Sequence, residues 1–191
     1  MVVSFGCAAA LMIGQSLISL SQAEAVLTSA HYFLQITDPP ISGESVDSRH
    51  RNEIDVLSFS MSVSQTVSGT GAGGAGGAGV DPATCGILRL LKNVDKASPQ
   101  LVTSVILGRH HNSAVLSSTT NQGLVNFTMR LTNVIVLSVN ISDSAGVPAA
   151  TEEVTLQAES FRLEVSAQDP KTGQPREPVV TTVDCVRQRA S

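Results

Sequence analysis

A glycine-rich run of the chain, GTGAGGAGGAG at residues 69–79, is of a type that can bind phosphate. A phosphate loop of the Walker type ends in Gly-Lys-Ser/Thr and opens a helix, because the lysine and the hydroxyl hold the phosphates and the magnesium ion. Here the run ends in Val80-Asp81-Pro82. A dinucleotide fingerprint also requires a following helix, whereas the next apolar run favours a strand. The sequence therefore argues against a nucleotide site, and we expect no cofactor.

The adjacent pair His110 and His111 could supply metal ligands. Adjacent side chains point in different directions, and no cysteine or carboxylate cluster lies nearby at ligand spacing. We therefore expect a solvated loop after a helix and no metal site. No serine lies in a Gly-x-Ser-x-Gly elbow. Glu152 and Glu153 offer carboxylates, but sequence cannot distinguish a glycosidase pair from surface charge. The chain is predicted to have no catalytic residue and not to be an enzyme.

The N-terminal segment, MVVSFGCAAALMIGQSLISLSQAEA, carries no charged side chain before Glu24. Its apolar run is followed by Ala23-Glu24-Ala25, a small-x-small cleavage pattern, so residues 1–25 are interpreted as a secretory signal peptide. The segment has no Lys or Arg, which leaves two alternatives: an uncleaved membrane anchor or a wrongly assigned start codon. Cleavage would leave no stable membrane insertion.

Removal of this segment would leave two cysteines, Cys85 and Cys185. An even pair in an exported chain predicts a disulfide, either within one chain or between subunits. The alternative is a pair of buried free thiols that act as small hydrophobic side chains.

Charge and composition limit the class of protein further. A net charge of −4 and a pI of about 5.5 give no support for nucleic-acid binding, which requires a basic surface. Aromatic residues make up only 3% and tryptophan is absent, so the core is expected to consist of Val, Leu and Ile, which favour β-structure. Residues 26–191 are predicted to form one domain.

Periodicity predicts strands that position these residues. Leu57, Phe59, Met61 and Val63 alternate with serines, which indicates a strand with one core face. Ile54 and Val56 have the opposite parity, so either both faces are covered or a bulge re-registers the strand. The run 124–142 is long for one strand and must bend or cross between sheets, with alternate residues from Val125 to Ile141 on one face. A parity change near Glu159-Ser160 indicates a bulge or corner.

One short helix is predicted at residues 99–107. Ser98 is a good N-cap, Pro99 suits the first turn, and Gly108 suits the position after the helix. Leu101, Val102, Val105 and Ile106 recur at helical spacing. With six to eight strands, this pattern predicts a mainly β protein, an antiparallel β-barrel of two sheets with one flanking helix. Residues 68–80 then form a flexible loop between two strands.

Two motifs carry a resemblance to a known family. GESVDSRHRNEIDVLSFSMSVSQ (residues 43–65) and NVDKASPQL (residues 93–101) resemble the start of the barrel and the approach to the helix in the Hcp family, the haemolysin-coregulated proteins of type VI secretion. LTNVIVLSV, EEVTLQAESFRLEV and the closing AQDPKTGQPREPVVTTVDCV are similar to its later strands. The resemblance covers about residues 33–187, with Val183 where the family commonly has an aromatic residue.

The resemblance implies a structural protein whose hexameric rings stack into a hollow tube, with itself as main partner and with effector or tip proteins as others. A signal peptide would make it secreted or periplasmic, whereas family members are normally cytoplasmic until the secretion machine exports them. The alternative is a secreted Hcp-like binding module that forms no tube. In a ring or stacked tube, the loop would contact a neighbouring subunit through its glycines: Gly69, Gly71, Gly73, Gly74, Gly76, Gly77 and Gly79.

Overall fold

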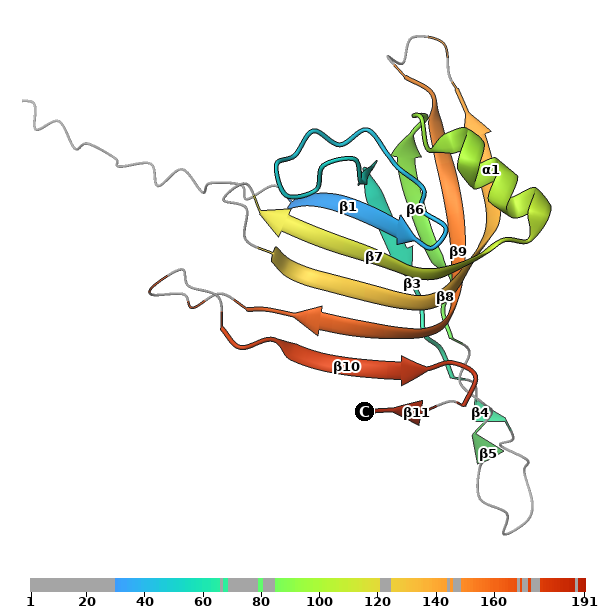
Figure 1. Ribbon diagram of the computed structural model, residues 1–191. Coiled ribbons are helices and arrows are strands. Elements are labelled where there is room, and N and C mark those ends of the chain that lie inside the picture. Colours follow the sequence, from blue (N-terminus) through green and yellow to red (C-terminus); the bar gives the residue numbers. More distant parts are fainter. Residues whose placement is uncertain are drawn as a thin grey trace, which may run out of the picture.

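The computed structural model describes residues 30–65, 67–68, 79–80, 85–120, 125–143, 145, 149–167, 169, 172, 176–187 and 189–191. The elements are β1 (Ala30–Thr37), β2 (Ile54–Val56), β3 (Ser58–Met61), β4 (Val67–Ser68), β5 (Gly79–Val80), β6 (Leu88–Asn93), α1 (Ser98–Leu107), β7 (His110–Thr120), β8 (Val125–Ser142), β9 (Thr151–Val165), β10 (Val179–Asp184) and β11 (Arg189–Ala190). The protein is therefore mainly β with one helix, as the sequence predicts (Figure 1).

All strands except β4 and β5 belong to one antiparallel sheet that closes on itself. The order is β11-β10-β9-β8-β7-β1-β2, and β3 returns to β9 through β6. Only Leu57 separates β2 from β3, and its backbone N–H donates to Leu91 O at 2.8 Å. Strands β1, β2/β3, β6, β9, β8 and β7 thus form a barrel, from which β10 and β11 extend along the second half of β9 (Figure 1).

The break at Leu57 explains the opposite parities of β2 and β3. Ile54 and Val56 are buried, whereas Leu57 is half exposed and Phe59 packs against the core from the other parity. The strand is therefore re-registered at Leu57, which is the second of the two alternatives that the sequence left open. The serines of β3 face outward, as their alternation predicts.

A corner crosses β7, β8 and β9 at aligned positions, occupied by Asn112, Asn133 and Glu159. Asn133 has a positive φ of 51°, which asparagine tolerates better than most residues. On each strand two consecutive inward side chains are three residues apart instead of two: His111 and Ala114, Leu131 and Val134, Ala158 and Phe161. The parity change predicted near Glu159 is confirmed, and the two predicted sheets are the two halves of one sheet folded along this corner.

The same corner corrects the predicted face of β8. The sequence placed Ile135 and Leu137 with the core-facing set, but Val134 and Val136 are buried and Leu137 is exposed. A register shift between Val136 and Ser138 then turns the strand again, so that Val139 packs against the core. The strand crosses from one half of the sheet to the other, as its length predicts.

Helix α1 lies outside the barrel and packs against β8 (Figure 1). Leu101 is fully buried, and Gly108 ends the helix in the left-handed conformation with φ 55°. Two expectations were wrong. Ser98 is not the N-cap: Ala97 occupies that position, and the Ser98 side chain is buried in a polar network. Val102 and Ile106 do not face the core, because the narrow contact with β8 buries Leu101 and Ser104.

Strands β4 and β5 pair only with each other, with Val67 opposite Val80 and Ser68 opposite Gly79. They bracket the glycine-rich run. Of its seven glycines only Gly79 lies in a described strand, and the remainder of the predicted loop and the predicted signal peptide lie outside the described residues.

Candidate functional site

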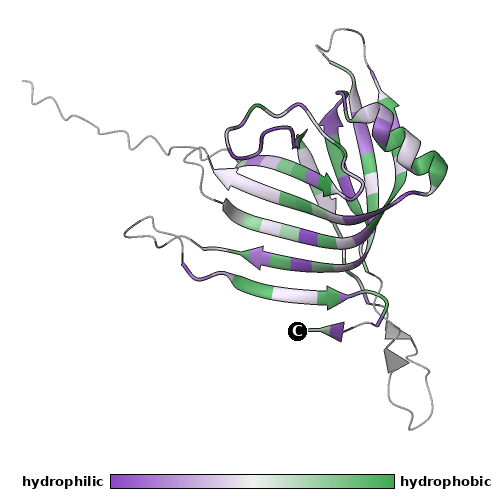
Figure 2. Ribbon diagram, in the orientation of Figure 1, coloured by the Kyte–Doolittle hydropathy of each residue, from purple (hydrophilic) through white to green (hydrophobic). Residues whose placement is uncertain are grey.

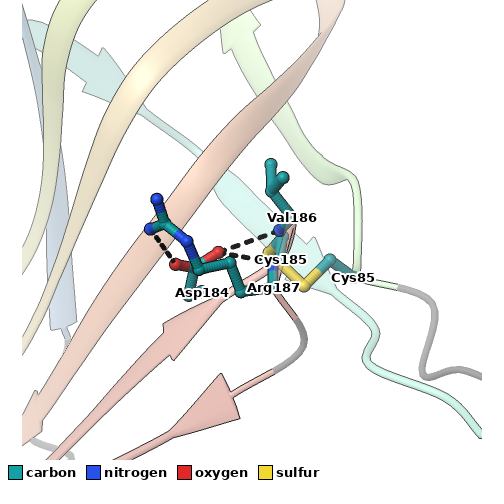
Figure 3. The surroundings of a disulfide bond; sticks show 5 residues. All are labelled: Cys85, Asp184, Cys185, Val186 and Arg187. Carbon is teal, nitrogen blue, oxygen red and sulfur yellow. Dashed lines mark hydrogen bonds and ion pairs between the residues drawn. A yellow bond between two sulfur atoms is a disulfide. The ribbon is translucent and has the colours of Figure 1, made fainter.

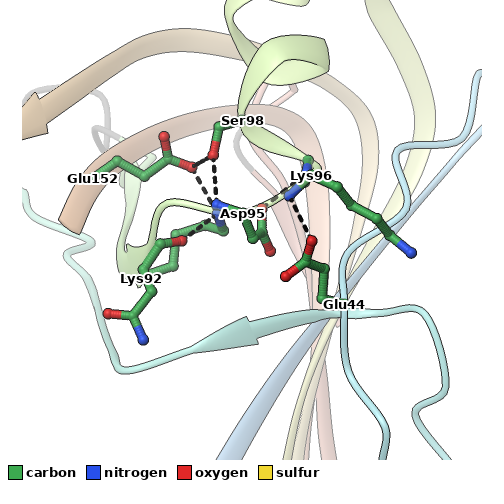
Figure 4. Close-up of polar contacts among 8 residues, drawn as sticks. Glu44, Lys92, Asp95, Lys96, Ser98 and Glu152 are labelled. Carbon is green, nitrogen blue, oxygen red and sulfur yellow. Dashed lines mark hydrogen bonds and ion pairs between the residues drawn. The ribbon is translucent and has the colours of Figure 1, made fainter. Parts of the chain in front are cut away.

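A buried charge network lies where β6, β9 and the start of α1 meet (Figure 4). Lys92 and Glu152 are cross-strand partners whose side chains are 1% and 0% exposed. The Lys92 ammonium donates to Glu152 Oε1, Asp95 Oδ1 and Asn93 O, each at 2.7 Å. All three ammonium donors thus have partners, a condition for keeping a charge out of water.

Ser98 connects this network to the helix. Its hydroxyl donates to Glu152 Oε1 at 2.8 Å and accepts from the backbone N–H of Asp95 at 3.0 Å. Asp95 Oδ1 also accepts from the backbone N–H of Ala97 at 2.9 Å. The residues of the second motif therefore fix the first turn of α1 to the barrel wall through buried polar contacts.

The first part of the first motif, residues 43–53, forms a loop over the outer side of β1. His50 stacks on Phe33, with ring centroids 4.3 Å apart, and donates to Glu53 at 2.9 Å. Asp47 accepts from the backbone N–H groups of Arg49 and His50. These hydrogen bonds, the one to Arg49 above all, hold the pKa of Asp47 below its ordinary value of 3.8.

The two motifs contact each other directly. Glu44 accepts a hydrogen bond from the backbone N–H of Lys96 at 3.2 Å, across 52 positions of sequence (Figure 4). Gly43 makes this loop possible, because a β-carbon there would lie 2.3 Å from Glu53 O. The motifs that carry the family resemblance thus build one junction between loop, barrel and helix.

Cys85 and Cys185 form a disulfide within one chain, with Cα atoms 5.4 Å apart (Figure 3). Cys85 lies just before β6, and Cys185 lies in the turn between β10 and β11. We call β10, this turn and β11 (residues 179–191) the C-terminal arm. The Asp184 carboxylate accepts from the backbone N–H groups of Arg187 and Val186 at 2.7 and 3.0 Å and from the Arg187 guanidinium at 3.0 Å. These bonds, first that of the Arg187 backbone, lower the pKa of Asp184 from 3.8.

A surface cavity of about 450 Å³ lies at the sheet corner, beside this disulfide. His110 donates to Asn133 Oδ1 at 2.8 Å, and Asn133 donates to Glu159 at 3.0 Å, so a polar chain follows the corner. Both cysteines line the same cavity. Sequence reasoning did not find this site, because its residues come from five separate segments of the chain.

The histidine pair lies in β7, not in the loop that the sequence led us to expect. His111 is buried, donates to Pro39 O at 2.6 Å and accepts from the Ser104 hydroxyl at 3.1 Å. It therefore joins β7 to α1. Within the described ranges, no group of three or more His, Cys, Asp or Glu side chains could hold a metal ion, and no helix there is long and apolar enough to cross a membrane.

A closed antiparallel barrel with a single helix on its flank and buried polar junctions defines the class of small β-barrel proteins. The family described as "Type VI secretion system effector, Hcp" matches residues 33–165. The chain belongs to this family and is a type VI secretion Hcp protein.

Solved structures agree with this assignment. Hcp1 from Salmonella typhimurium is 27% identical with a TM-score of 0.68, over 85% of this chain and 99% of that one. A type six secretion system protein (20% identity, TM-score 0.72, 85% and 100% coverage) and a type VI secretion system effector from Yersinia pestis (24% identity, TM-score 0.63, 80% and 98% coverage) share the fold. No curated protein matches the chain.

Proposed function

We propose that this protein is a self-assembling subunit whose hexameric rings stack into a hollow tube. The observation that carries the proposal is the family match over residues 33–165, since ring and tube assembly is known for the family. A rigid closed barrel suits this role, because heterologous contacts between identical rigid subunits close into rings when the rotation allows it. The proposed activity is self-association and not catalysis.

The outer end of α1 supplies a surface for such contacts. Ile106 and Leu107 are 78% and 61% exposed, and Val102 is exposed beside them. Figure 2 shows this apolar end of the helix facing away from the barrel. Clustered exposed apolar residues often mark a protein interface. In the proposed ring, this end of α1 contacts the next subunit.

Electron microscopy of the purified protein, together with light scattering, tests the assembly. Rings and stacked tubes are the expected result for the wild type. The double change Ile106→Ser and Leu107→Ser should weaken ring formation. The protein should remain folded, because both side chains are exposed. Gln100→Ala, an exposed polar position on the same helix, is the matched control. A folded wild type that stays monomeric at all concentrations would favour the alternative, a secreted Hcp-like binding module that forms no tube.

The glycine-rich loop, which β4 and β5 bracket, is proposed to contact a neighbouring subunit. Its deletion between Ser68 and Gly79 should reduce stacking or ring closure while the barrel stays folded, as circular dichroism and microscopy would show. Unchanged assembly after the deletion would contradict this contact. Effector or tip proteins are proposed as further partners of the assembled tube.

Export through a cleaved signal peptide at residues 1–25 is proposed as the route to a secreted or periplasmic location, where the Cys85–Cys185 bond is stable. N-terminal sequencing of the exported protein tests it, and a mature protein that begins near Val26 is expected. An intact Met1 on exported protein would instead support cytoplasmic assembly and export by the type VI machine.

A further inference from the structure

The disulfide joins two parts of the molecule that are stabilised differently. Cys85 leads directly into β6, which pairs with barrel strands on both edges, β3 and β9. Cys185 follows β10, and the two cysteines are 100 residues apart in sequence. The bond therefore fastens the C-terminal arm to the closed barrel (Figure 3).

The C-terminal arm has few other attachments. β10 pairs along one edge with residues 160–165 of β9, and the backbone N–H of Cys185 donates to Glu159 O at 2.9 Å. On the other edge, β11 covers Val183 and Asp184, and Ser191 exchanges backbone hydrogen bonds with Thr182. None of the arm's described residues is fully buried, and only Val183 and Cys185 pack against the core. Segments with few buried apolar contacts open at lower free energy than a core strand does.

The two sulfur atoms belong to residues that a solute can approach. Cys85 and Cys185 are half-buried and line the surface cavity of about 450 Å³, together with His110 and Glu159. A small thiol can enter a cavity of this size without unfolding of the barrel.

We propose that Cys85–Cys185 is a thiol–disulfide exchange site for dithiol reductants, and that its reduction releases the C-terminal arm from the barrel. One thiolate of the reductant attacks one sulfur, forms a mixed disulfide and expels the other cysteine as a thiolate, which takes up a proton. The second thiol of the reductant then closes its own disulfide and releases the remaining cysteine. Two electrons pass from the dithiol to the protein.

Opening of the arm uncovers the edge of β9 at residues 160–165, whose backbone groups β10 otherwise pairs. The bond therefore keeps β10 paired with this edge. This inference does not depend on ring formation, because it concerns bonds within one subunit.

The third cysteine of the chain, Cys7, is replaced (Cys7→Ser) so that only Cys85 and Cys185 can yield new thiols. Dithiothreitol applied to this full-length variant without denaturant tests the exchange step. Alkylation and mass spectrometry should count two new thiols while circular dichroism remains that of a folded protein. Reduction that occurs only in denaturant would overturn the proposal.

Hydrogen exchange of the same protein tests release of the arm. On reduction, the exchange rates of the β10 amides are expected to increase at least about tenfold more than those of the β1 and β7 amides. Equal acceleration in all strands, or none, would overturn the proposal. The Cys85→Ser, Cys185→Ser double variant is the control: it should exchange like the reduced protein and should not respond to dithiothreitol. Reduction of the parent protein gives the same information if this variant fails to fold.

Discussion

The barrel and the C-terminal arm belong to one continuous sheet, but different interactions hold them. Each barrel strand has a neighbour on both sides, because β2 and β3 together close the sheet between β1 and β6. The arm pairs with β9 on one side only, apart from the short β11. Buried apolar side chains lie throughout the barrel, whereas the described part of the arm has none.

This difference shows two ways of finishing a sheet. Closure removes the free edge of the barrel, whose wall also contains the buried charge pair of Lys92 and Glu152. An added edge strand retains unpaired backbone groups on its outer side. In this protein a covalent bond between Cys85 and Cys185 also attaches that edge strand to the barrel.

The largest expected effect tests the charge network of the barrel. Lys92→Met removes the ammonium and leaves Glu152 buried without its positive partner, so the free energy of unfolding should fall by about 3–5 kcal/mol. Urea denaturation measures it. Adding Glu152→Leu should restore much of the loss, since the uncompensated charge is then gone; a double variant no more stable than Lys92→Met would contradict this account.

Reduction of the disulfide should have the next largest effect. Loss of a bond that closes a long loop is expected to lower the free energy of unfolding by about 2–5 kcal/mol. Denaturation with and without dithiothreitol measures it, and the Cys85→Ser, Cys185→Ser variant serves as the insensitive control. An unchanged midpoint would mean that the arm needs no covalent attachment.

Two glycines are required for different reasons: Gly43 for lack of space around its Cα, and Gly108 for its positive φ. Gly43→Ala would place a β-carbon 2.5 Å from Ile54 Cα as well as against Glu53 O, so the loop must shift at a cost of about 1–3 kcal/mol. Gly108→Ala meets no atom within 4 Å and only strains a φ of 55°, at about 1 kcal/mol. Thermal unfolding should therefore show a larger loss at Gly43, and equal losses would refute the close approach.

The smallest effect concerns pH and the turn of the arm. The folded pKa of Asp184 is lowered, so its contribution is present above the ordinary value of 3.8 and is lost as pH falls through the folded pKa. The protection factors of the Val186 and Arg187 amides, which compare their exchange rates with those of an unfolded chain at the same pH, should fall on acidification across that range. Asp184→Asn should lower these protection factors already at neutral pH and reduce their pH dependence. A variant identical to the wild type would exclude the carboxylate from the turn.

Much of the fold could be predicted because alternation and turn residues are local signals. The outward serines of β3, the Gly108 helix end and the parity change near Glu159 are confirmed. The prediction of which β8 residues face the core was wrong, because a corner at Asn133 and a register shift at Leu137 change the inward parity twice within one strand. Ser98 and His111 were misjudged for another reason, since their partners Glu152 and Pro39 lie far away in sequence.

By itself, the sequence determined the mainly β class, the single short helix and, through two motifs, the Hcp family, because these depend on periodicity and on residues close together in the chain. Only the tertiary structure decided that the motifs meet through Glu44 and Lys96, that Cys85 ties the arm to the barrel, and that Ile106 faces solvent. The physical reason is that burial and pairing depend on which distant strands become neighbours, and closure of the sheet sets that arrangement.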